Sequence, residues 1–265
     1  MAKTDILDAA RVVAFLLLSA APPGCGGDDS GPTGPSSMPT PGAVRWMFTG
    51  ETWQASGAPP ACPTPLVFTT PVDLARVTSI LYPGQSRGGG YRPHGGFRFD
   101  GPGESGSIAV IAPLAAEITR AARYLERGEL QYLFEFVNAC GIMYRFDHLR
   151  NLSARLQQAA AVLPAANEGD SRTADVPAGL AVTAGETLAE GLGAPVAGNV
   201  FVDWGVYDLR SSNQASMNGA WLAQHRDEFS PFAICWLDNL APGDAAVVRS
   251  LPPSGDSGSR SDYCH

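Results

Sequence analysis

The stretch LQYLFEFVNACGIMYRFDHL, residues 130–149, decides the fold of this chain. Every second residue of its first part is apolar or aromatic: Leu130, Tyr132, Phe134 and Phe136. Side chains of an extended strand point alternately to its two faces, so this period of two predicts a strand at 130–137 with one apolar face. Residues 142–149 are also rich in aromatic and apolar side chains, which predicts a second strand.

Apolar stretches of strand length occur on both sides of this segment, at 107–112 (SIAVIA) and 199–209 (NVFVDWGVYDL). One helix is expected at 153–163, where Ser153 can cap the first turn and Pro164 stops the segment. A series of strands with one short helix predicts a mainly β fold, built as an antiparallel sheet or sandwich.

The overall composition excludes several classes of protein. The 265 residues are 45% hydrophobic and 17% charged, which is typical of a globular chain and not of a disordered, collagen-like or multi-span membrane protein. The formal net charge is −8, and no basic block occurs. An acidic chain of this kind is a poor candidate for binding nucleic acid, so we expect no nucleic-acid partner.

Residues 1–25 have the features of an export signal. Arg11 precedes an apolar run at 12–21, shorter than the roughly 20 residues that a membrane-spanning helix needs. Cys25 follows this run and resembles the cysteine of bacterial lipoproteins, which is lipidated and becomes the N-terminus of the mature protein. Ordinary export with cleavage nearby is the alternative. Residues 26–42 consist largely of Gly, Pro, Ser and Asp, which predicts a flexible linker before a folded part at 43–265.

The four other cysteines agree with an oxidising compartment. An even number in an exported protein predicts two disulfides. Three pairings are possible. We favour Cys235 with Cys264, which would hold the C-terminal tail, and Cys62 with Cys140, which would tie the N-terminal part to the core. A zinc cluster is the less favoured alternative, because no Cys-x2-Cys spacing occurs.

A series of short segments runs from residue 83 to residue 210. They are 83–85 (PGQ), 92–100 (RPHGGFRFD), 110–118 (VIAPLAAEI), 144–149 (YRFDHL), 182–189 (VTAGETLA) and 201–208 (FVDWGVYD). In order and spacing they resemble the lysostaphin or LytM-type zinc endopeptidases, which cut peptide bonds in bacterial peptidoglycan. The resemblance covers roughly half of the chain and implies a LytM-like antiparallel β-sheet with a groove.

The resemblance also implies candidate site residues. His94 stands where the family has its first metal-binding histidine, and His148 matches the catalytic histidine of its Tyr-x-His-Leu motif. Arg98 stands where the family has an aspartate ligand. Asp100, on the same strand face as Arg98, could serve as a displaced ligand or pair with Arg98.

The final His-x-His motif of the family is missing from this chain. Its two positions fall on Phe201 and Asp203, of which Asp203 can bind a metal. The implied set for one Zn²⁺ is therefore the following three residues: His94, Asp100 and Asp203. His148 would be the catalytic residue, with Arg98 and Tyr144 on the substrate side. Because Arg98 would repel a cation on this face, a reworked or lost metal site is favoured over an intact one.

These features predict an exported protein of the cell envelope, lipid-anchored on its periplasmic or extracellular face. The first hypothesis is a non-catalytic or reworked module that binds peptidoglycan or a cell-wall enzyme in the groove. The alternative is an active zinc metalloendopeptidase that hydrolyses peptidoglycan cross-links with a substituted ligand set. Residues 211–265 lie outside the resemblance, and we expect them to pack on the sheet through four apolar residues and a disulfide. These four are Phe229, Phe232, Ile234 and Trp236.

Overall fold

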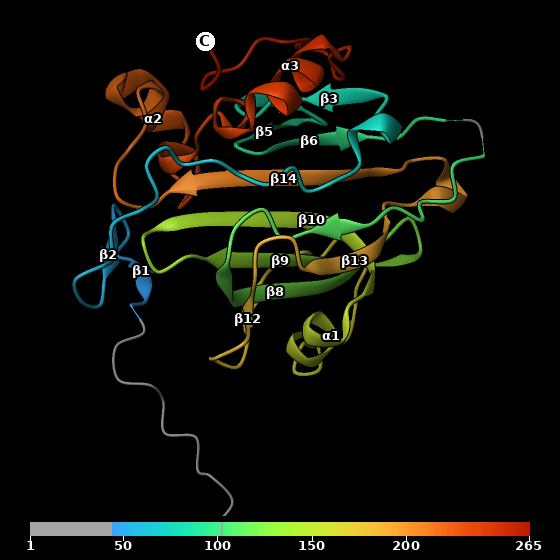
Figure 1. Ribbon diagram of the computed structural model, residues 1–265, viewed down its shortest axis with the longest axis horizontal. Coiled ribbons are helices and arrows are strands. Elements are labelled where there is room, and N and C mark those ends of the chain that lie inside the picture. Colours follow the sequence, from blue (N-terminus) through green and yellow to red (C-terminus); the bar gives the residue numbers. More distant parts are fainter. Residues whose placement is uncertain (1–43, 102) are drawn as a thin grey trace, which may run out of the picture. The chain divides into compact units, whose positions relative to one another are not determined.

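The computed structural model describes residues 44–101 and 103–265 (Figure 1). The predicted export signal at 1–25, its Cys25 and the predicted linker at 26–42 lie outside these residues. Within the described ranges, the helices are all too short or too polar to cross a membrane.

The main sheet is antiparallel throughout, with the strand order β11-β8-β9-β10-β14-β6-β3. Its long strands are β8 (Ala116–Glu126), β9 (Glu129–Val137), β10 (Ile142–Leu152) and β14 (Phe201–Asp208). The other strands of this sheet are β3 (Ser79–Leu81), β6 (Gly95–Arg98), β7 (Val110–Ile111), β11 (Ala174–Asp175), β12 (Ala181–Val182) and β13 (Thr187–Leu192). In the part of the chain that the structure describes, two hairpins stand apart from it: β1 (Trp46–Phe48) with β2 (Trp53–Ala55), and β4 (Gln85–Arg87) with β5 (Gly90–Arg92).

The sequence-based prediction of a mainly β fold is confirmed. The predicted strands at 130–137, 142–149 and 199–209 correspond to β9, β10 and β14. The predicted strand at 107–112 is mostly loop, and only Val110–Ile111 forms β7. Although Ile108 is buried, its N–H bonds back to the Gly106 carbonyl in a turn, so it does not join a strand ladder.

Within the described residues, three α-helices flank the sheet, of which one was predicted. α1 (Ala154–Ala160) is shorter than the predicted 153–163, and the Ser153 side chain makes no capping hydrogen bond. α2 (Gly219–Gln224) is capped by the Asn218 side chain, and α3 (Pro242–Ser250) begins with a proline at its first helical position. Both helices contain glycine near their start and are short, which explains why their sequences gave no clear helical pattern.

The predicted apolar face of β9 lies in the core. The rings of Phe136 and Tyr144 stack with their centroids 4.7 Å apart, and those of Phe146 and Trp204 are 6.1 Å apart. Phe134 and Phe136 are fully buried, whereas Leu130, at the end of the strand, is exposed. The core is therefore an aromatic layer that runs across β9, β10 and β14.

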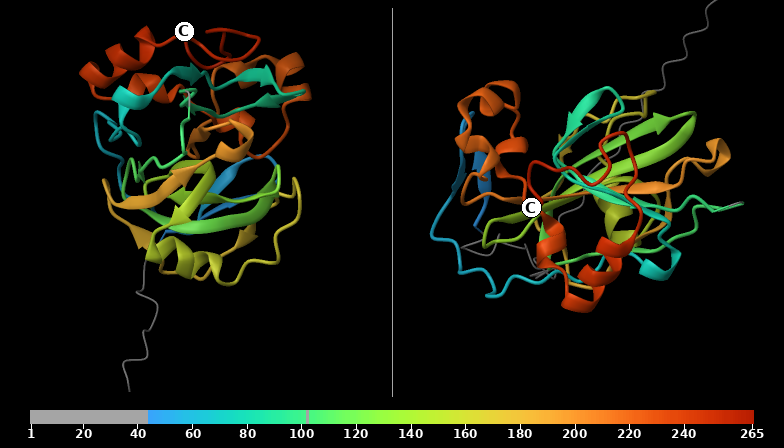
Figure 2. Two further views of the ribbon diagram at one scale, coloured as in Figure 1. Left: turned by 90° about the vertical axis from the view of Figure 1, so that its right-hand side faces the viewer. Right: turned by 90° about the horizontal axis from the view of Figure 1, so that it is seen from above.

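Both favoured disulfide pairings are present. Cys62 is bonded to Cys140, and Cys235 to Cys264. The C-terminal segments, orange to red in Figure 2, gather beside the teal strands β3–β6. Trp236 packs on Trp204, with ring centroids 4.5 Å apart, as expected for a C-terminal region that covers the sheet.

Candidate functional site

The face of the sheet opposite the aromatic layer is polar, although it is largely buried. Arg145 and Asp147 alternate with Phe146 along β10, and Asp203 alternates with Trp204 along β14. Asp147 lies directly opposite Asp203 in the β10–β14 register. Two carboxylates in such a cross-strand pair repel each other, so this position requires compensating charges and donors.

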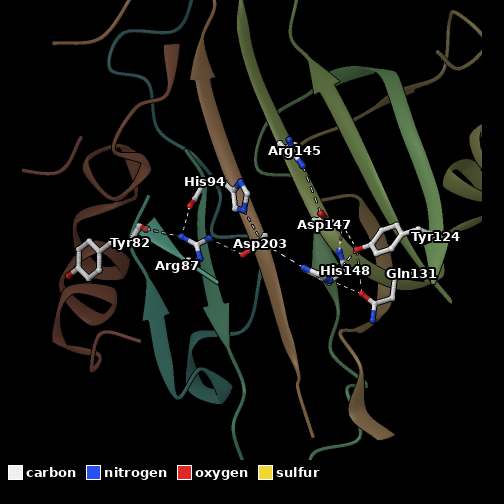
Figure 3. Close-up of polar contacts among 9 residues, drawn as sticks. All are labelled: Tyr82, Arg87, His94, Tyr124, Gln131, Arg145, Asp147, His148 and Asp203. Carbon is white, nitrogen blue, oxygen red and sulfur yellow. Dashed lines mark hydrogen bonds and ion pairs between the residues drawn. The ribbon is translucent and has the colours of Figure 1, made fainter. Parts of the chain in front are cut away.

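The charged and hydrogen-bonding side chains that offset this repulsion lie around Asp203 (Figure 3). Its Oδ2 lies 3.0 Å from His94 Nε2 and 3.6 Å from His148 Nε2, and its Oδ1 lies 3.2 Å from an Arg87 guanidinium nitrogen. The four side chains are each 14% exposed or less. We call Arg87, His94, His148 and Asp203 the Asp203 cluster.

The surroundings of Asp203 stabilise its charged form. Burial by itself would raise the pKa of this carboxyl. The interactions with His94, His148 and Arg87 outweigh burial and hold the pKa of Asp203 well below its ordinary value. Asp203 is therefore a buried carboxylate, and one of its partners is the permanently charged guanidinium of Arg87.

A β-bulge brings His148 to the polar face. The β9–β10 register shifts between Phe146 and Leu149, and His148 has a φ of 67°, in the left-handed region. In a regular strand, His148 would point to the core side, because Asp147 before it points to the polar face. The bulge instead redirects the side chain of His148 to the polar face. Asp147 and His148 thus both contribute to the same polar network.

Hydrogen bonds fix the ring of His148. Its Nδ1 lies 2.7 Å from Gln131 Oε1 and 3.1 Å from the Tyr124 hydroxyl, which donates to Asp147 Oδ1 at 2.6 Å. Because the amide oxygen of Gln131 only accepts, Nδ1 of His148 carries a proton. The Nε2 atom of the same ring faces Asp203.

The pKa values of the two histidines of the cluster are shifted in opposite directions. Burial lowers the pKa of His94 and outweighs the attraction of Asp203, so His94 is neutral near neutral pH. Burial would also lower the pKa of His148, but the charges of Asp147 and Asp203 outweigh it and raise that pKa. His148 therefore keeps its proton to a higher pH than an ordinary histidine does.

Arg87 reaches Asp203 from the β4–β5 hairpin. The turn of this hairpin contains Gly88 and Gly89, both with positive φ, which glycine adopts without steric cost. The C-terminal tail fixes the hairpin: the Gln85 amide donates to the Gly258 carbonyl at 2.6 Å, and the Tyr91 hydroxyl donates to Asp262 at 2.8 Å. The disulfide at Cys264 anchors this tail.

The structure brings three of the expected site residues together and leaves three apart. His94, His148 and Asp203 meet in the Asp203 cluster. Asp100 does not join them: Arg98 holds it in two hydrogen bonds of 2.7 and 2.9 Å. The expectation of Asp100 as a displaced ligand is therefore not met, and the alternative, pairing with Arg98, is what the structure contains.

Arg98 and Tyr144, expected on the substrate side, are placed elsewhere. Arg98 also bonds Asn199 and lies over the Phe201 ring, at 5.5 Å from its centroid. Tyr144 is fully buried in the aromatic layer, where its hydroxyl donates to the Leu114 carbonyl. Tyr144 shares a strand face with Phe146 rather than with Asp147, so it points away from the polar network.

Sequence analysis missed five residues of this network. They are Arg87, Tyr124, Gln131, Arg145 and Asp147. Arg87 precedes three consecutive glycines, which indicates a turn but not what its side chain reaches. Gln131 and Arg145 lie between the core-facing apolar residues of their strands. A polar residue at these alternate positions was the one indication in the sequence of a polar second face.

The Asp203 cluster does not fit a zinc ion. The guanidinium of Arg87 is already bound to Asp203, on the carboxylate that a metal would need. The Nε2 atom of His94 lies 3.0 Å from the same carboxylate, and Asp100 is held by Arg98. Among residues 44–101 and 103–265, no group of three His, Cys, Asp or Glu side chains is arranged to hold a metal ion.

Comparison with known proteins adds no further constraint: no family profile, curated protein or solved structure matches this chain. The functional interpretation therefore depends on the geometry of the site and on the sequence motifs.

Proposed function

We propose that this chain is an exported cell-envelope protein whose β-sheet domain binds peptidoglycan or a cell-wall enzyme without hydrolysing peptide bonds. The observation that carries the proposal is the ion pair between Arg87 and Asp203. A guanidinium, fixed by its hairpin, neutralises the carboxylate that would otherwise attract a metal cation. The Asp203 cluster then stabilises the domain rather than activating water.

Two sequence features support the cellular location. The export signal at 1–25 and Cys25 favour a lipid-anchored protein on the periplasmic or extracellular face. The two disulfides are compatible with an oxidising compartment. If Cys25 is lipidated, the wild-type chain partitions into the membrane fraction and Cys25→Ser does not.

The ordered series of LytM-like motifs supports the envelope ligand. A sheet that keeps this motif order while losing the His-x-His pair is expected to retain a binding surface more readily than catalysis. The second candidate, an active zinc metalloendopeptidase, is favoured by the convergence of His94 and His148 on Asp203.

Incubation of the purified protein with peptidoglycan sacculi tests both candidates. We expect the protein to sediment with the sacculi and to release no soluble peptides, in the wild type and in His148→Ala alike. Release of soluble peptides by the wild type, lost in His148→Ala, would establish the enzyme instead. If the protein neither sediments with sacculi nor cross-links to a cell-wall enzyme in cells, the binding proposal fails.

A further inference from the structure

The part of the polar face farther from Asp203 forms an open groove, between the β1–β2 hairpin and strands β8 and β9. The groove has a volume of about 680 Å³. Aromatic side chains of the hairpin line one side, among them Trp46, Phe48 and Trp53, and Glu135 of β9 lies against it from the sheet. We call this space the Glu135 groove.

We propose that the Glu135 groove binds a primary ammonium group, namely the side-chain amine of a lysine-like residue in a peptide. This inference rests on the proposed binding function and names where the ligand sits and which group is recognised. It is carried by three observations: the state of Glu135, the aromatic wall and the charge of the lining.

Glu135 is a buried carboxylate with an incomplete set of partners. Its side chain is 2% exposed, and its ion pair with Arg120 is long, at 3.5 Å. Arg120 is shared, because its Nη1 donates to Glu228 at 2.9 Å. In the described part of the chain, neither oxygen of Glu135 accepts a hydrogen bond from another side chain. A buried carboxylate in this state leaves room for an additional donor.

The other charges near Glu135 do not supply that donor. Arg145, its direct cross-strand neighbour, extends toward the ring of Phe229, 5.5 Å from the centroid. Burial raises the pKa of Glu135, an effect that Arg145 and Arg120 partly offset. A ligand cation in contact with Glu135 would stabilise its charged form further.

The aromatic wall is held in place before any ligand arrives. The indole of Trp53 donates to the Glu228 carbonyl at 2.9 Å, and that of Trp46 to the Ala139 carbonyl at 3.2 Å. Phe48 packs against Trp53, with centroids 5.4 Å apart. Aromatic faces attract ammonium groups and pack on aliphatic chains, so this wall suits the four-carbon stem and charged head of a lysine.

The charges that line the groove complement a cation. Four acidic residues contribute to it, against two arginines. The acidic residues are Glu117, Glu135, Asp175 and Glu228, and the arginines are Arg45 and Arg120. The surplus of negative charge favours an ammonium ligand over a carboxylate or phosphate.

The test uses the purified protein and the peptide acetyl-Ala-Lys-Ala-amide, with binding followed by tryptophan fluorescence, since Trp46 and Trp53 line the groove. The matched probe replaces lysine by norleucine, which keeps the carbon chain and removes the charge. We expect saturable binding of the lysine peptide, and binding at least about tenfold weaker for the norleucine peptide, as for the loss of one charge-assisted contact.

Three variants locate the binding. Glu135→Gln keeps the shape of the side chain and should weaken lysine-peptide binding about tenfold. Glu190→Gln removes an exposed carboxylate of β13 and should leave binding unchanged. Circular dichroism of both variants verifies that the fold is retained, and Trp53→Leu, which removes part of the aromatic wall, should also weaken binding.

The outcomes separate this inference from the proposed function. Equal binding of the two peptides, no binding of either, or unchanged affinity in both Glu135→Gln and Trp53→Leu overturns the assignment of the groove. If the protein still sediments with sacculi in that case, the proposed function stands and another surface carries it. If the lysine peptide binds in a way that depends on Glu135 but the protein does not sediment with sacculi, the assignment of the groove is supported. Peptidoglycan is then contradicted as the ligand.

Discussion

The Asp203 cluster and the Glu135 groove occupy the same face of one sheet, yet they differ in how their carboxylates are satisfied. Asp203 has three cationic or donor side chains within 3.6 Å and is not among the residues that line the Glu135 groove. Glu135 has one long ion pair and faces a groove. A buried charge with a complete set of partners contributes to the fold, whereas one with an incomplete set is available to a ligand.

The largest expected effect is loss of stability on breaking the Asp203 cluster. Asp203→Leu leaves Arg87 buried without its counter-charge, and we expect it to lower the free energy of unfolding by about 3–5 kcal/mol. The control Asp100→Leu breaks the more exposed pair with Arg98 and should cost under about 1 kcal/mol. Urea unfolding measures both. Equal costs would mean that the cluster is no more important to the fold than a surface ion pair.

Removing both partners should be less harmful than removing one. The double variant Arg87→Met/Asp203→Leu leaves neither charge of that pair buried, so its free energy of unfolding should exceed that of Asp203→Leu alone by about 2 kcal/mol or more. A double-mutant cycle in urea provides the comparison. Additive losses would show that Arg87 and Asp203 act independently, against the proposed ion pair.

The two histidines should give pH dependences of opposite sign. In His148→Gln, His94 remains, and its lowered pKa gives a contribution to stability that is present above about 6.5, its unfolded pKa, and lost as the pH falls through its folded pKa. In His94→Gln, His148 remains, and its raised pKa gives a contribution present below about 6.5 and lost as the pH rises through its folded pKa.

Thermal unfolding of both variants and the wild type across this pH range measures these slopes. Relative to the wild type, His148→Gln should become less stable toward acid, and His94→Gln less stable toward alkali. Identical slopes in the two variants would contradict a lowered pKa for His94 and a raised pKa for His148.

The smallest effect on stability is expected at the groove. Arg120 and Glu228 are each about a third exposed or less, and Glu228→Gln should lower the free energy of unfolding by under about 1 kcal/mol. Chemical denaturation measures this change beside that of Asp203→Leu. A loss of stability as large as that of Asp203→Leu would contradict the difference between the Asp203 cluster and the Glu135 groove.

The sequence predicted the aromatic layer better than the polar face. The period of two in β9 placed Phe134 and Phe136 correctly, because alternation is a local property of an extended chain. It also implied that Gln131 and Glu135 share the opposite face, but not that this face is buried. Burial there depends on the β1–β2 hairpin and on segments far away in the sequence, which no local pattern records.

The Asp203 cluster was predicted in part for the same reason. His94, His148 and Asp203 were found through motif order, whereas Arg87 required the hairpin and the C-terminal tail that positions it. His148 reaches the face through a bulge, and a one-residue irregularity of this kind is decided by tertiary contacts. Tyr144 was misplaced because it lies on the core side of the same strand.

The most direct test of the central claim is a zinc titration of the purified protein, with bound metal measured by elemental analysis after dialysis. Because Arg87 already neutralises Asp203, we expect no stoichiometric zinc to remain on the wild-type chain. One zinc ion per chain, lost in both His94→Ala and Asp203→Ala, would contradict this account and restore the metalloendopeptidase.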